Sequence, residues 1–178
     1  MPRLRHRLAW TLLALLLPVS ALAQRRSDPL NPLEIDQLRD AAQDADTRLK
    51  LFVEFARLRL TALEQVRTDP KITNKGDAVH DRLQDFVDVY DELNQNIDTF
   101  NDRKADLRKV LKVIIDADTE FQARLRAVKD SAGAGKDEKT YEFVLADAMD
   151  DVDTSIGDHR QLLAEQEEAA KRKKEHKH

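Results

Sequence analysis

Apolar residues recur at a strict spacing through the middle of this 178-residue chain. The steps between them alternate between four and three residues, and neither Gly nor Pro occurs in residues 77–132. The positions of this stripe are Val79, Leu83, Phe86, Tyr90, Leu93, Ile97, Phe100, Lys104, Leu107, Leu111, Ile114, Asp118, Phe121, Leu125 and Val128. A sustained spacing of 3.5 residues is typical of helices that pack lengthwise as coiled coils. The pattern predicts a single helix over residues 77–132, with Asp77 as its cap.

A second helix is predicted on the N-terminal side of this stripe. Asn31 and Pro32 form a helix start, because an Asn side chain caps free amides and proline fits the first helical turn. Apolar residues then follow at helical spacing, and Pro70 ends the pattern because the residue before a proline avoids helical geometry. The predicted helix covers residues 32–67, and residues 68–76 form a loop. The stripe consists of Leu38, Ala42, Ala45, Leu49, Phe52, Ala56, Leu60 and Leu63.

A third helix is predicted after Gly133-Ala134-Gly135, with Asp137 as its cap. Its stripe runs from Tyr141 to Ala170 and becomes less apolar toward the end. Gly157 lies inside this helix and weakens it, since glycine is a poor helix former.

The fold class is therefore all-α. Short loops make neighbouring helices antiparallel, so three long helices predict an elongated antiparallel bundle or coiled coil whose exposed edges a second chain could cover. The alternative is a break in the central helix near residues 99–103, where Asn101 and Asp102 are suitable caps, which would give a four-helix up-down bundle. The heptad phase passes through this region unshifted, which favours the unbroken rod.

Residues 1–23 have the pattern of a secretory signal peptide. A basic start with three arginines is followed by an apolar run over residues 8–19 and by Ala21-Leu22-Ala23. This order predicts cleavage between Ala23 and Gln24 and a periplasmic or secreted product. No Cys follows that site, so the pattern does not predict a lipid anchor, and no membrane span is expected after cleavage.

The remaining chain divides into three parts by composition. An irregular lead-in is expected over residues 24–31, a helical bundle domain over residues 32–170 and a basic disordered tail over residues 171–178. The tail holds five Lys or Arg and one Glu, whereas residues 27–170 hold 20 bases and 33 acids. Such an acidic body disfavours nucleic acid as a partner. The basic tail is expected to make at most weak contact with an anionic envelope surface.

Two charges lie on the apolar stripe, Lys104 and Asp118. Buried polar residues at such positions commonly fix the register of packed helices. Antiparallel counting places Lys104 near Glu165, or near Asp40 and Asp44, and places Asp118 near Asp150. We expect ion pairs inside the bundle rather than a binding point.

The acidic residues could form a metal centre or could simply be solvated on the surface. Seven acidic residues could converge if the last two helices are antiparallel, and carboxylates are the ligands of Ca²⁺ and Mg²⁺. Neither local run has the glycine of an EF-hand, so a solvated acidic face is the expectation. These residues are Asp116, Asp118, Glu120, Asp147, Asp150, Asp151 and Asp153.

The histidines do not predict a metal or haem site. His80 follows Asp77 at three residues, but the Glu-x-x-His pairs of di-iron bundles are missing from the sequence. His159 lies on the last apolar stripe, where we expect packing. Met149 is on the same predicted helix, so it could not bind a haem from the side opposite His159.

No catalytic chemistry is predicted. The chain has no Cys, only four Gly, and no Ser in the strand-turn-helix context of a hydrolase nucleophile. No cofactor, metal or catalytic residue is therefore assigned. The predicted function is that of an exported, non-enzymatic interaction or scaffold module that self-associates or binds a protein. The alternatives are a periplasmic chaperone-like holdase and a small-ligand- or metal-binding bundle, which would need the compact four-helix form.

Overall fold

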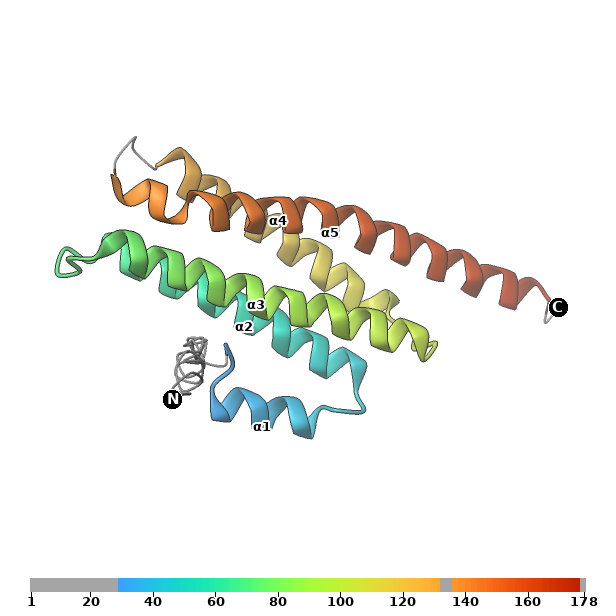
Figure 1. Cartoon of the computed structure of the whole chain (residues 1–178). Helices are drawn as coiled ribbons and strands as arrows, with labels where there is room; N and C mark the ends of the chain where they lie inside the picture. The colour runs from blue at the N-terminus through green and yellow to red at the C-terminus, as the bar shows by residue number, and fades with distance from the viewer. Residues whose placement is uncertain (1–28, 132–135, 177–178) are drawn as a thin grey trace, which may run out of the picture.

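The computed structural model describes residues 29–131 and 136–176. These residues form five helices, which confirms the all-α class. They are α1 (Pro32–Asp40), α2 (Ala45–Thr68), α3 (Lys75–Asp102), α4 (Arg108–Asp130) and α5 (Lys136–Glu175) (Figure 1). The expected signal peptide and most of the lead-in lie outside the described residues.

The prediction of one central helix is wrong, because the chain breaks between α3 and α4. Lys104 adopts a left-handed backbone with φ of 61°. The amide of Lys104 donates to the carbonyl of Asn101, and the amide of Ala105 donates to the carbonyl of Phe100. These are the two hydrogen bonds of a Schellman motif, which normally has glycine at the left-handed position. Because a lysine occupies that position, the sequence carries no glycine to mark the break.

The first predicted helix is also interrupted, at residues 41–44. Asp44 caps α2 by accepting from the amide and hydroxyl of Thr47, at 3.1 and 2.7 Å. Arg48 donates to the carbonyl of Leu38 at the end of α1, at 2.5 Å. The cap and this arginine satisfy backbone groups that a continuous helix would have paired internally.

At the other end of the chain, α5 continues through Glu175. The prediction of a disordered tail from residue 171 is therefore wrong as far as Glu175. In Figure 1 this last part of α5 projects beyond the neighbouring helices. The start of α3 also differs from the prediction, since the helix begins at Lys75 after Asn74 rather than at Asp77.

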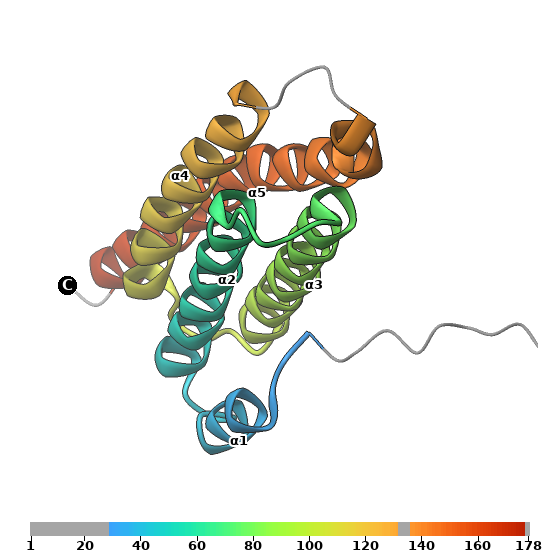
Figure 2. The same ribbon diagram turned by 90° about the vertical axis from the view of Figure 1, so that its left-hand side faces the viewer.

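The four long helices form a bundle of two antiparallel hairpins, α2–α3 and α4–α5 (Figures 1 and 2). α3 packs against α5 and α2 packs against α4, whereas α1 packs only against α2. The elongated three-helix rod is thus replaced by the four-helix alternative. Within the described residues no helix is long and apolar enough to cross a membrane.

The apolar stripe predicted from the sequence forms the core despite the break. Every one of its positions is buried except Lys104, which is exposed in the connection. The stripe residues of α3 and α4 therefore meet in one interior instead of lying along one rod. Phe86, Tyr90 and Phe121 form an aromatic cluster there, with ring centroids 5.6 to 6.2 Å apart.

Candidate functional site

Three polar side chains from three helices meet inside the bundle. Asp118 of α4 is 0 % exposed, Tyr90 of α3 is 1 % exposed and His159 of α5 is 4 % exposed. The Tyr90 hydroxyl donates to Oδ1 of Asp118 at 2.9 Å, and Nδ1 of His159 lies 2.8 Å from Oδ2 of the same carboxylate. Each carboxylate oxygen therefore has a partner on a different helix. We call Tyr90, Asp118 and His159 the core triad.

Helical spacing explains why these residues face inward. Tyr90 and Asp118 both occupy positions of the apolar stripe, and His159 lies seven residues after buried Val152 on α5. Tyr90 stacks on Phe86 at an interplanar angle of 15° and meets the edge of Phe121 at 84°. The rings exclude water from the carboxylate and strengthen its hydrogen bonds, because the local dielectric is low.

Burial raises the pKa of the Tyr90 phenol far above its ordinary value, and the Asp118 carboxylate adds to this effect. A hydrogen bond with Ser155 acts in the opposite direction. Tyr90 is therefore a neutral hydrogen-bond donor at physiological pH.

Ser155 and Asn94 extend the polar group between α3 and α5. Nδ2 of Asn94 donates to Oγ of Ser155 at 3.0 Å. Oδ1 of Asn94 is buried without a hydrogen-bond partner among the described residues. Tyr90, Asn94 and Ser155 thus join α3 to α5 through side chains.

Within the core triad, the Asp118–His159 pair resembles the carboxylate–histidine pair of a catalytic site, but it is buried in the core. A carboxylate that orients a histidine is a usual element of nucleophilic catalysis, which also needs a nucleophile and space for a substrate. The hydroxyl of Ser155 is used by Asn94, and the aromatic rings fill the interior around Asp118. A hollow of about 530 Å³ lies elsewhere, lined by Asp46, Asp106, Arg108, Lys109, Lys112 and Glu167.

The prediction for Asp118 is confirmed in kind, because it makes a buried pair within the bundle. Its partner is His159, not a residue near Asp150. Lys112 likewise pairs with Glu167 and Arg126 with Asp153, so α5 is shifted along α4 relative to the simple antiparallel count. The prediction for Lys104 is wrong, since this residue is exposed at the end of α3. His80 is also on the surface, 3.6 Å from Asp81.

The seven acidic residues that the antiparallel count could bring together do not all meet at one place. Glu120 pairs with Arg57 and Arg124, Asp153 contacts Gln122 and Arg126, and Asp118 is in the core. Within the described ranges, no group of three or more His, Cys, Asp or Glu is placed to hold a metal ion.

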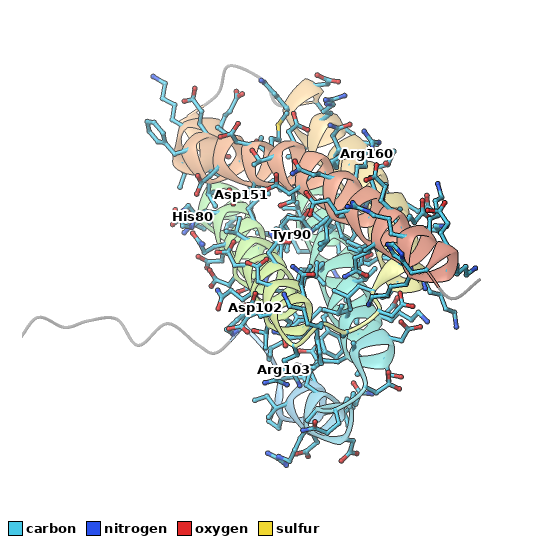
Figure 3. The ribbon with its side chains drawn as sticks, turned by 90° about the vertical axis from the view of Figure 1, so that its right-hand side faces the viewer. His80, Tyr90, Asp102, Arg103, Asp151 and Arg160 are labelled. Atoms are coloured by element: carbon cyan, nitrogen blue, oxygen red, sulfur yellow. The ribbon has the colours of Figure 1, made fainter. Side chains whose placement is uncertain are left out.

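A second charged feature lies along α3 and the first half of α5, which we call the acidic face. α3 has eight acidic residues and two Lys or Arg. Residues 137–158 of α5 have eight acidic residues and one Lys. α3 packs against α5, and Asp91 of α3 lies near Asp147 and Asp151 of α5, on the side where Figure 3 labels Asp151.

The carboxylates of this face crowd one another across the two helices. The pKa of Asp91 is raised by partial burial and by Asp88 and Asp147. The pKa of Asp151 is raised by partial burial and by Asp147 and Asp91. Like charges brought close together disfavour ionisation. The acidic face therefore carries electrostatic repulsion that a cation would relieve.

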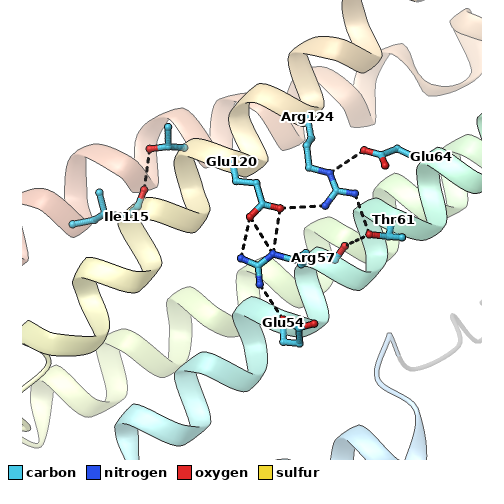
Figure 4. A network of polar contacts seen from close by, with 8 residues as sticks. Glu54, Arg57, Thr61, Glu64, Ile115, Glu120 and Arg124 are labelled. Atoms are coloured by element: carbon cyan, nitrogen blue, oxygen red, sulfur yellow. Dashed lines mark hydrogen bonds and ion pairs between the residues drawn. The ribbon is translucent and has the colours of Figure 1, made fainter.

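The α2–α4 side has the opposite charge balance. α2 has five Lys or Arg against three acidic residues, and α4 has six against four. Nη2 of Arg57 lies 3.0 Å from Glu120, and Nε of Arg124 lies 2.9 Å from Glu64 (Figure 4). The Arg57 guanidinium lowers the pKa of Glu120. These ion pairs join α2 to α4, whereas the acidic face has an excess of one charge.

The fold defines the class of the protein as an all-α bundle with a short fifth helix on its outside. Comparisons with protein-family models, with curated proteins and with solved structures found no match to this chain.

The sequence placed all three residues of the core triad on apolar stripes. It did not predict the hydrogen bond of Tyr90, because a tyrosine on an apolar stripe usually serves only in packing. The charge on Asp118 was the available signal that a polar partner had to lie opposite it.

Proposed function

We propose that this chain is an exported, non-enzymatic helical-bundle protein that acts as an interaction module. The acidic face is its docking surface, and its partner is a protein segment rich in Lys and Arg. The observation that carries this proposal is the crowding of Asp91, Asp147 and Asp151 across α3 and α5; partial burial, and after it this crowding, raises the pKa values of Asp91 and Asp151.

Physical reasons favour docking through charge. Complementary charge speeds encounter and selects among partners. A lysine- or arginine-rich segment that docks between α3 and α5 would neutralise carboxylates that now repel one another. The repulsion lowers the stability of the free protein. Functional surfaces often carry such a cost in stability.

The core triad supports a non-enzymatic role. Its three polar groups bond to one another across three helices, and such buried networks specify which helices pack together. Tyr90, Asp118 and His159 are thus accounted for by the assembly of the bundle.

The holdase alternative draws less support from the surface. Among the residues that the structure describes, the large exposed apolar side chains are only Leu33, Leu58, Val113 and Phe143. A client-binding surface would group such residues. The ligand-binding alternative has the compact four-helix form that it requires, but the side chains of Tyr90, Asp118 and His159 bond to one another.

Site-specific photo-crosslinking in cells tests the proposed docking surface. A photoreactive amino acid at Ala146, beside Asp147, is compared with one at Leu58 on α2; both positions are exposed. We expect a protein adduct at position 146 that is lost when Asp91, Asp147 and Asp151 are all changed to Asn. The matched control removes three exposed carboxylates elsewhere, by Asp36→Asn, Asp40→Asn and Asp130→Asn. Equal adducts at both positions, or loss in the control alone, would contradict the proposal.

Export is tested separately, by expression in a double-membraned bacterium and N-terminal sequencing of the product. The signal pattern of residues 1–23 leads us to expect a periplasmic chain that begins at Gln24. A chain that keeps its first 23 residues and stays in the cytoplasm would overturn this part of the proposal.

A further inference from the structure

The short helix α1 is held on α2 by Arg48 and Arg59, which belong to a regular row of side chains on α2. Arg48, Phe52, Phe55 and Arg59 recur at steps of four, three and four residues, so they share one face of α2. We call this row the docking stripe. Its two phenylalanines are 1 % and 3 % exposed, with ring centroids 6.4 Å apart.

The two arginines of the docking stripe bind the two ends of α1. Arg59 makes a bridge to Glu34 at 2.5 Å, in which both side chains are largely buried, and donates to the carbonyl of Pro29 at 2.5 Å. Arg48 donates to the carbonyl of Leu38 at 2.5 Å. The N-terminal end of α1 thus lies at Arg59 and its C-terminal end at Arg48, so α1 runs antiparallel to α2, as Figure 1 shows.

The hinge between the two helices lacks the residues that normally break a helix. Residues 41–44 are Ala-Ala-Gln-Asp, and alanine and glutamine are strong helix formers. The bend is maintained by the Asp44 cap and by the arginine contacts rather than by Gly or Pro. A straight helix over residues 32–68 would keep the apolar spacing that the sequence shows across the hinge.

Straightening the hinge in one copy alone would expose Leu38 and Ala41 of the α1 segment and Phe55 of the docking stripe, all buried when α1 is docked. A second copy carries the same α1 and the same stripe, so it can restore every lost contact. We propose that α1 exchanges between two copies of this chain. Each copy then has one continuous helix over residues 32–68, and each α1 docks on the Arg48–Arg59 stripe of the other copy.

The register of the docked helix fits a two-fold arrangement. Glu34 lies opposite Arg59 and Leu38 lies opposite Arg48 in the single copy. Two straight antiparallel helices that repeat the Glu34–Arg59 pair are centred between Asp46 and Thr47, and those that repeat the Leu38–Arg48 contact are centred at Gln43, so the long arginine side chains span the difference. Ala45 lies between these two centres, where a small side chain allows close approach, and the interface is self-complementary as a two-fold dimer requires.

The exchange uses no contact that the single copy lacks, apart from the crossing itself. Its equilibrium is therefore set by protein concentration and by the conformation of residues 41–44. This inference stands independently of the proposed docking partner. A dimer would display two acidic faces at once, which increases the affinity for a repetitive cationic partner.

The chain has no Cys, so single cysteines can be introduced for labelling. One preparation carries a donor dye at Leu33→Cys on α1 and a second carries an acceptor at Leu58→Cys on α2; both positions are exposed. The two are mixed at about 1 mM, which is comparable with the effective concentration of a short tether. We expect energy transfer to develop and light scattering to report a dimer.

Hinge variants distinguish exchange from any other association. Asp44→Ala removes the cap that the bend needs, so we expect it to raise the dimer association constant about fivefold or more. The double change Ala42→Gly and Gln43→Gly disfavours a continuous helix, so we expect a decrease of similar size. Arg59→Ala removes the Glu34 pair that holds α1 on the stripe in the single copy and in the dimer alike, so α1 should undock and the dimer should disappear with it. Arg124→Ala, which removes an arginine on the α2–α4 side, should leave the dimer unchanged.

Circular dichroism confirms that each variant retains the four long helices. A monomer at all concentrations for Asp44→Ala, or a dimer that neither the hinge variants nor Arg59→Ala affect, would overturn the exchange. Loss of the crosslinked partner at residue 146 would leave these results unchanged, so the two proposals fail independently.

Discussion

The imidazole of His159 lies 2.8 Å from the carboxylate of Asp118 in the interior of the bundle, where neither side chain is more than 6 % exposed. A buried pair of this kind is costly to assemble and more costly to break on one side. Its contribution is therefore best measured by comparing single and combined replacements.

Replacing His159 alone by Leu leaves the Asp118 carboxylate buried with only Tyr90 as partner. We expect the free energy of unfolding to fall by about 3–5 kcal/mol, the usual cost of an unpaired buried charge. The combined change His159→Leu, Asp118→Leu and Tyr90→Phe removes all three polar groups and should recover most of this loss. Urea unfolding measures both, and equal losses in the two variants would contradict a paired role.

The raised pKa of Tyr90 predicts a stability that declines in alkaline solution. In the unfolded chain the phenol ionises near its ordinary pKa of 10, whereas in the folded protein it stays protonated to higher pH. Stability from this group is therefore complete below pH 10 and is lost as the pH rises above it.

The variant Tyr90→Phe isolates this effect from the ionisation of lysines. It should be less stable than the unmodified protein at pH 8, and the difference should shrink by about 1.4 kcal/mol at pH 11. A difference that is constant with pH would show that the folded-state pKa of Tyr90 is not raised. Tyr141→Phe is a useful comparison, because burial also raises the pKa of that more peripheral tyrosine.

Two glycines predict changes of opposite sign. A Cβ atom at Gly76 would lie 2.9 Å from the carbonyl oxygen of Asp137, so Gly76→Ala must push α3 and α5 apart and should cost about 1–3 kcal/mol. A Cβ atom at Gly157 meets nothing within 4 Å, so Gly157→Ala should stabilise the protein by about 1 kcal/mol. Thermal unfolding of both variants checks the close approach of the two helices.

Lys104 is the left-handed residue of the turn after α3, with φ of 61°. Lys104→Gly should raise the free energy of unfolding by about 1 kcal/mol, because glycine adopts this conformation without steric cost. Lys104→Ala retains the Cβ atom and should have little effect, which separates backbone strain from the loss of charge. If both variants behave alike, the helix break is not held in the left-handed form.

Repulsion on the acidic face predicts that Asp151→Asn stabilises the free protein at pH 7. A carboxyl whose pKa is raised in the folded state disfavours folding above that pKa, and the penalty disappears as the pH falls through it. The gain should be a few tenths of a kcal/mol, since surface charges are screened. Added salt should stabilise the unmodified protein more than the variant, as measured by urea unfolding in dilute and concentrated NaCl.

Phe121 and Lys104 show which burial predictions from the sequence were correct and which were not. Both lie on the same apolar stripe, and the spacing correctly placed Phe121 in the core. It misplaced Lys104, because the Schellman turn has no glycine to mark it and the stripe resumes in phase at Leu107; Asn101 and Asp102, as suitable caps, indicated the break only as the alternative. The same reasoning placed Asp118 inside the bundle but could not identify His159 as its partner.

The sequence by itself determined the helical class and which residues of α3 and α4 are buried, because both follow from the period of the apolar positions. Tertiary structure alone decided where the helices break, since Arg48 and Arg59 bind α1 across the fold and the break after Asp102 depends on backbone geometry. It also decided that Tyr90, Asp118 and His159 meet and that α3 and α5 share one acidic face. Those juxtapositions depend on how the helices cross, which the spacing along one chain does not encode.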